Sequence, residues 1–83
     1  AAFASTREIF KAPLLINATA ILLVHNHPGG DPHPSADDRQ TAQRLREAGH
    51  LMDIKVLDFM VITTDSFYSF ASSEPDWQSS KGG

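Results

Sequence analysis

The chain has 83 residues, a formal net charge of −3 and no cysteine. This length fits one domain with a small core. Without cysteine, a metal would have to be bound by imidazole and carboxylate groups. The acidic balance suits a phosphate backbone poorly, so a nucleic acid is not the expected partner. Because no apolar run approaches the ~20 residues needed to cross a bilayer, the composition predicts a soluble, cytoplasmic protein.

The first two predicted elements are a short helix and a buried strand. The segment STREIFKAPLLIN, residues 5–17, opens with Ser5 and has Glu8 three residues later, which is the spacing of a capping box. Pro13 predicts a short or kinked helix, because proline removes a hydrogen bond from a helix interior. The apolar run TAILLVH, residues 19–25, has the length and the branched residues of a strand buried on both faces.

A loop and a longer helix are expected next. Glycines and prolines punctuate residues 26–34 and exclude a regular helix or strand there. Ser35 is a suitable N-cap. The sequence after it gives the helix one apolar stripe, formed by Ala42, Leu45, Ala48 and Met52. Gly49 marks the C-terminal region of this helix.

Two further strands complete the predicted domain. The segment IKVLDFMVIT, residues 54–63, is rich in residues that favour strands, and FYSF, residues 67–70, follows a turn signal as a short third strand. The order helix, strand, loop, helix, strand, strand predicts an α/β layered domain within residues 1–72. The polar composition of residues 73–83 predicts a flexible tail.

Candidate metal ligands flank the loop. Alternate side chains of a strand share a face, so His25 and His27 can point together if the extended chain continues through Asn26. Seven residues separate His27 from Ser35. If Ser35 caps the helix, Asp38 lies in its first turn, and the loop can bring this turn over the histidines. Two imidazoles and one carboxylate are a typical ligand set for a catalytic Zn²⁺ whose fourth position is left to water.

Each part of this pattern also has a purely structural interpretation. Surface histidines are common, and Ser35-x-x-Asp38 alone is a capping arrangement. Asp31, His33 and Asp37 could compete as ligands. On the helix, Asp37 should point about 100° away from Asp38, and His33 lies between prolines, where exposure is expected. The combination of these features after a buried strand favours a metal site, with the three competitors as bystanders.

The combined pattern resembles the JAMM motif of JAB/MPN metalloproteases, in which His-x-His is followed, after a spacer, by Ser-x-x-Asp. The segments REIF, NATAILLVHNHPGGDPHPS, LREAG, DIKVLD and YSF are similar, in the same order, to the bacterial RadC-like branch over residues 5–71. The resemblance implies a cytidine-deaminase-like mixed sheet with flanking helices, and hydrolysis of peptide or isopeptide bonds. It also implies that His25, His27 and Asp38 bind Zn²⁺, and that Ser35 assists catalysis by holding the tetrahedral intermediate.

One part of the family's site is not expected in this sequence. In JAMM enzymes a glutamate takes the proton from the zinc-bound water, and it lies before the helix that precedes the His-x-His strand. Glu8 is the only acidic residue before the motif, and it matches the start of that helix. We therefore expect a partial domain that lacks the first strands and is inactive alone. An unpaired sheet edge would then favour homo-oligomerisation.

Two other functions stay open at this point. The RadC name suggests an association with DNA repair, but the basic residues are scattered, and the three that share a helix form a weak patch: Arg39, Arg44 and Arg46. MPN-type domains also occur as non-catalytic interaction modules that have lost their ligands, whereas this chain retains the whole set. A peptide or protein is therefore the expected substrate.

Overall fold

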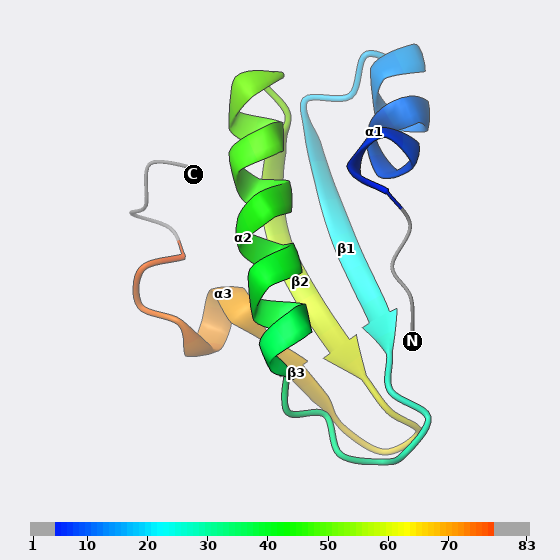
Figure 1. Ribbon diagram of the computed structural model, residues 1–83, viewed down its shortest axis with the longest axis vertical. Helices are drawn as coiled ribbons and strands as arrows, with labels where there is room; N and C mark the ends of the chain where they lie inside the picture. Colours follow the sequence, from blue (N-terminus) through cyan, green and yellow to red (C-terminus); the bar gives the residue numbers. More distant parts are fainter. Residues whose placement is uncertain (1–4, 78–83) are drawn as a thin grey trace.

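The computed structural model describes residues 5–77, which form a three-stranded sheet with helices around it (Figure 1). In chain order the elements are α1 (Thr6–Leu15), β1 (Ala20–Asn26), α2 (Ala36–Leu51), β2 (Lys55–Ile62), β3 (Phe67–Ser69) and α3 (Phe70–Ser73). Within the sheet, β1 is parallel to β2 and β2 is antiparallel to β3. This mixed-sheet α/β architecture confirms the predicted class and is consistent with a JAB-type fold. The short helix α3 was not predicted.

The helix boundaries follow from local hydrogen bonds. Ser5 caps α1 by accepting a bond from the Glu8 N–H at 3.2 Å, as the sequence spacing predicted. Pro13 lies inside this short helix of 10 residues. Asn17 and Asp53, which follow α1 and α2, both have φ of 58°. Short polar side chains tolerate this left-handed conformation and allow the chain to reverse after a helix.

The core lies between α2 and one face of the sheet, and Figure 1 shows α2 in front of β2. Ala42 and Leu45, from the predicted apolar stripe, are 2% and 1% exposed, while Ala48 and Met52 pack against the same core. Burial of this stripe holds α2 along the sheet. Its N-terminal end therefore lies over the end of β1 that carries the histidines.

The prediction that the first strand is buried on both faces was wrong for the described residues. Ile21 and Leu23 pack against the core, whereas Leu22 and Val24 are 56% and 55% exposed. These side chains alternate because successive residues of a strand point to opposite faces. Within residues 5–77, only one of these faces packs against the core, and β1 is an edge strand of the sheet.

The described part of the predicted tail belongs to the folded structure. Trp77 is 5% exposed, its ring lies 5.6 Å from that of Phe70, and its Nε1 donates a hydrogen bond to the Leu57 carbonyl at 3.0 Å. The large apolar surface of the indole explains why residues 73–77 pack although the segment is polar on average. Residues 78–83, also predicted as tail, lie outside the described residues. Among the helices of residues 5–77, none has the length and apolar character required to span a membrane.

Candidate metal centre

The end of β1 places two imidazoles on one face of the sheet. The His27 N–H donates a hydrogen bond to the Ile62 carbonyl at 2.8 Å, so extended pairing with β2 continues past Asn26. His25 and His27 therefore point the same way, as the sequence spacing predicted, with ring centroids 5.2 Å apart and ring planes at 82°. Their side chains are 20% and 22% exposed. An ion from solvent can therefore reach both rings.

The first turn of α2 holds a carboxylate opposite these rings. Ser35 and Asp38 form a complete capping box: Ser35 Oγ accepts a bond from the Asp38 N–H at 3.1 Å, and Asp38 Oδ2 accepts one from the Ser35 N–H at 2.7 Å. The Asp38 side chain is 1% exposed. The capping interpretation and the metal-ligand interpretation are thus compatible, because the cap fixes the direction in which the carboxylate points.

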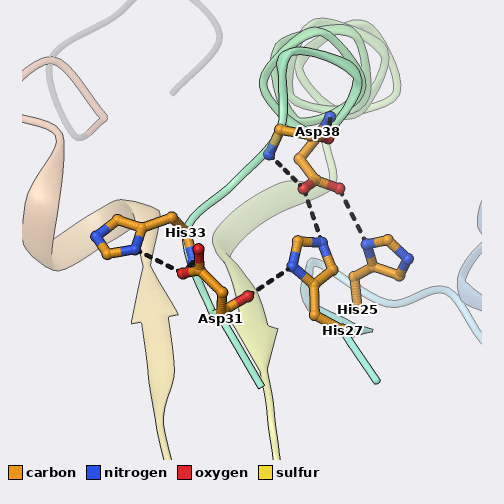
Figure 2. Close-up of polar contacts among 6 residues, drawn as sticks. His25, His27, Asp31, His33 and Asp38 are labelled. Carbon is orange, nitrogen blue, oxygen red and sulfur yellow. Dashed lines mark hydrogen bonds and ion pairs between the residues drawn. The ribbon is translucent and has the colours of Figure 1, made fainter. Parts of the chain in front are cut away.

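Figure 2 shows the carboxylate of Asp38 opposite both rings, with one oxygen directed at each. Asp38 Oδ1 lies 3.0 Å from His25 Nδ1, and Asp38 Oδ2 lies 3.0 Å from His27 Nε2. Each residue offers one ligand atom within 4.8 Å of the others. Zinc binds nitrogen and oxygen ligands at about 2.0–2.2 Å in a tetrahedron, which separates neighbouring ligand atoms by about 3.3 Å. The observed spacing suits such an ion after small side-chain movements.

The ionised state of Asp38 favours the binding of a cation. Burial alone raises the pKa of Asp38, but the hydrogen bonds from Ser35 and His25, together with the charge of His27, outweigh it and leave the pKa below its ordinary value. The carboxylate is therefore ionised at neutral pH. Metal binding requires this form, since a protonated acid would have to lose its proton first.

The His27 ring provides a second test of the fit. Its Nδ1 lies 3.0 Å from the main-chain carbonyl oxygen of Asp31. A carbonyl only accepts hydrogen bonds, so this contact places a proton on Nδ1. In the neutral ring, Nε2 then carries a lone pair that faces Asp38 Oδ2. Two acceptor atoms in contact require a cation between them. Without a metal ion this cation is a second proton on the ring, whose charge lowers the pKa of Asp38. A metal ion can replace that proton, so the donor set suits a metal ion.

The three competing ligands lie outside this triad. Asp31 Oδ1 accepts a bond from the His33 N–H at 3.0 Å and lies 2.7 Å from His33 Nδ1, and these bonds hold the pKa of Asp31 below its ordinary value. The side chains of Asp31 and His33 are 77% and 79% exposed, and Asp37 is also exposed. Sequence reasoning missed the Asp31 carbonyl, because a main-chain contact leaves no residue-type signature.

Comparison with known proteins decides the family. The profile of the RadC-like JAB domain family matches residues 1–75. The chain belongs to this family. The match spans the sheet, α2 and the candidate triad, so the RadC-like resemblance of the sequence is confirmed. This RadC-like JAB domain therefore contains a candidate metal site of His25, His27 and Asp38.

Bacterial proteins with the name UPF0758 are similar to this RadC-like JAB domain. One from Actinobacillus succinogenes is 49% identical over 71 residues, which cover 86% of this chain and 31% of that protein. One from Geotalea uraniireducens is 55% identical over 64 residues, covering 77% and 28%. A third, from Vibrio cholerae, is 51% identical over 65 residues, covering 78% and 40%. The chain thus spans less than a third of the first two relatives.

Proposed function

We propose that this RadC-like JAB domain binds one zinc ion through His25, His27 and Asp38, as the metal-binding part of a hydrolase of peptide or isopeptide bonds. The observation that supports this most directly is the convergence of three ligand atoms within 4.8 Å. One of these atoms belongs to the buried, ionised carboxylate of Asp38, which a nearby positive charge stabilises. A structural hydrogen-bond network alone does not require two rings on the same carboxylate.

The choice of zinc follows from the ligand types. The chain has no cysteine, and two imidazoles with one carboxylate are a ligand set of catalytic zinc sites, which leave one position open. A zinc ion held there would act as a Lewis acid and lower the pKa of water near the substrate carbonyl. His25 and His27 would contribute ligand atoms from the sheet, and Asp38 would contribute one from α2.

We assign Ser35 the role of a hydrogen-bond donor to the substrate. Its Oγ accepts the bond from the Asp38 N–H, and this bond does not use the hydroxyl hydrogen. Ser35 is also exposed at the margin of the triad. Its hydroxyl can therefore donate a hydrogen bond to the carbonyl oxygen as negative charge develops on it during hydrolysis. Such donors stabilise the transition state selectively, because the charge is absent from the ground state.

Glu8 does not supply a general base. It lies in the first turn of α1, where its N–H and carboxylate face Ser5. General acid–base catalysis contributes roughly 10²–10⁴ in rate. We therefore expect the 83-residue chain to bind zinc but to hydrolyse peptides slowly, if a base is not supplied to it by another chain.

Zinc content and calorimetry test this proposal. The purified protein should bind one zinc ion per chain, and His25→Ala should weaken binding by roughly 100-fold or more, because a first ligand is lost. His50→Ala is the matched control, since His50 is an exposed histidine near the end of α2. A protein without stoichiometric zinc, or equal affinities for the two variants, would refute the proposal.

The partner that we propose is a peptide or protein, and the free edge of β1 within residues 5–77 offers main-chain groups to an extended peptide or to a second copy of the chain.

Association with DNA has weaker support. Arg39 is paired with Glu74 at 3.0 Å, and the Arg46 guanidinium lies 4.2 Å from the centre of the Trp77 ring. Two of the three arginines on α2 therefore already have intramolecular partners. A salt-sensitive mobility shift with duplex DNA would favour the DNA alternative.

A further inference from the structure

The turn between the His-x-His strand and α2 makes a specific contact with one ring of the site. The Asp31 carbonyl oxygen lies 3.0 Å from His27 Nδ1. The Asp31 side chain meanwhile binds the His33 N–H at 3.0 Å and contacts the His33 ring at 2.7 Å (Figure 2). Asp31 is thus held at its side chain by a residue two positions later, while its carbonyl faces the ring.

The contact to the carbonyl distinguishes the two nitrogens of His27. Because a carbonyl oxygen accepts but cannot donate, the hydrogen bond exists only when Nδ1 carries the proton. The remaining nitrogen, Nε2, faces Asp38 at 3.0 Å and, in the neutral ring, has the lone pair that a metal ion would take. In metal sites, a hydrogen bond at the second nitrogen commonly fixes both the tautomer and the orientation of a ligating ring.

From this geometry, and resting on the proposed zinc site, we propose that the turn of residues 30–33 is a positioning device for His27. It selects the tautomer with the proton on Nδ1 and keeps Nε2 available as the ligand atom. Asp31 and His33 do not bind the metal. They act through His27, by holding the Asp31 carbonyl in place.

The backbone of the turn depends on Gly30. Gly30 has a φ of 90°, which side-chain-bearing residues rarely adopt, whereas the neighbouring Gly29 does not have a positive φ. A Cβ added at either glycine would meet nothing within 4 Å. Alanine at Gly30 is therefore strained by backbone conformation alone, while alanine at Gly29 is not. The two positions form a matched pair next to the same carbonyl.

Zinc affinity provides the first measurement. Gly30→Ala should weaken zinc binding by roughly 10-fold, the lower end of the range for the loss of a partner that orients a ligand. Gly29→Ala should leave the affinity within about 2-fold. Asp31→Ala should weaken binding less than Gly30→Ala does, because its side chain is largely exposed. Asp31→Asn should restore most of this loss, since its amide oxygen can still accept the His33 N–H.

The tautomer provides a second measurement that is independent of affinity. Two-dimensional ¹⁵N–¹H spectra of the zinc-loaded wild type should show His27 with its proton on Nδ1, in a hydrogen bond that protects this proton from exchange with solvent. In Gly30→Ala the proton should exchange faster, and in Gly29→Ala it should not. Thermal unfolding of the same samples separates this local effect from a loss of fold.

The outcomes are distinguishable from failure of the proposed function. A wild-type protein that binds no zinc overturns the zinc site. A wild-type protein that binds zinc, with equal affinities in Gly30→Ala and Gly29→Ala, overturns the positioning role of the turn. A zinc-loaded wild type whose His27 carries its proton on Nε2 also overturns it. Weaker binding and faster exchange of the Nδ1 proton in Gly30→Ala alone would support the inference.

Discussion

The two ends of α2 are attached to the sheet in opposite ways. At the N-terminal end, Ser35 and Asp38 exchange hydrogen bonds, and the buried carboxylate faces two imidazoles. At the C-terminal end, Gly49 is buried and lies directly against the main chain of Ile54. The N-terminal end is held by side-chain groups with directional bonds. The C-terminal end is held by close contact of main chains, which includes a hydrogen bond from the Ile54 N–H to the Gly49 carbonyl at 2.8 Å. The candidate metal site thus lies at one end of the helix, and the other end serves packing.

This difference leads to separable mutational effects. Close packing tolerates added volume poorly, because interiors have few voids and rigid surroundings. Polar contacts at a partly open site instead tolerate volume but depend on particular donors and acceptors. Substitutions at the Gly49 end should therefore change stability, while substitutions at the Ser35 end should change metal binding and activity more than stability.

The largest expected effect is at Gly49. A Cβ there would overlap the Ile54 carbonyl oxygen and lie 3.2 Å from Val56 Cγ2. Alanine normally stabilises a helix interior by about 1 kcal/mol relative to glycine, but main-chain overlap should reverse the sign. We expect Gly49→Ala to lower the free energy of unfolding by about 2–3 kcal/mol. Urea unfolding monitored by the fluorescence of the buried Trp77 measures this change.

Gly29→Ala is the control for this substitution, because its added Cβ would meet nothing within 4 Å. It should leave the unfolding midpoint nearly unchanged. If Gly49→Ala raised the free energy of unfolding, the packing around Gly49 would have space for an added methyl group. The contrast between the two ends of α2 would then be wrong.

The next effect compares the two serine caps. Ser35 and Ser5 both accept a bond from the N–H of an acidic residue three positions later, at 3.1 and 3.2 Å. Replacement of either by alanine should cost about 1 kcal/mol of stability. Only Ser35→Ala should also weaken zinc binding, because only Ser35 orients a proposed ligand, Asp38. Unfolding and zinc titration of both variants would test this, and equal zinc affinities would show that the cap does not position the carboxylate.

The geometry of the candidate site was predictable from the sequence where spacing alone determines the direction of a side chain. Strand periodicity placed His25 and His27 on one face, and the Ser-x-x-Asp spacing placed Asp38 in a capped first turn. Both are local rules that act over a few residues. The sequence could not show the Asp31 carbonyl contact, since it depends on the path of the loop and on φ at Gly30.

The positions of the helices and strands were also predictable from local patterns, but the burial of particular side chains was not. Periodicity and caps located the elements, but the exposure of Leu22 and the burial of Trp77 depend on which segments cover each surface. An apolar run predicts a buried strand whether or not a partner covers its second face. A single tryptophan in a polar segment is averaged away by composition, although its indole alone can attach the segment to the core.

The attachment of the C-terminal segment near the polar end of α2 involves Glu74. Arg39, one residue after Asp38, lies 3.0 Å from Glu74 Oε2, and the Tyr68 hydroxyl donates a hydrogen bond to the same oxygen. The bond from Tyr68, followed by the bond from Arg39, holds the pKa of Glu74 below the ordinary value of 4.5. This connection depends on charge, so pH should act on it more than on the steric contact at Gly49.

The smallest expected effect is therefore the pH dependence of this connection. A carboxyl group with a lowered pKa in the folded state stabilises the fold above its ordinary pKa, and the contribution is lost as the pH falls through the folded-state value. The difference in unfolding free energy between wild type and Glu74→Gln should be largest near pH 7 and shrink as the pH falls below the ordinary pKa of 4.5. Glu47→Gln, on the exposed surface of α2, controls for removal of a carboxylate. A difference that grew on acidification would contradict the sign of the shift and show that the polar end of α2 does not depend on this ion pair.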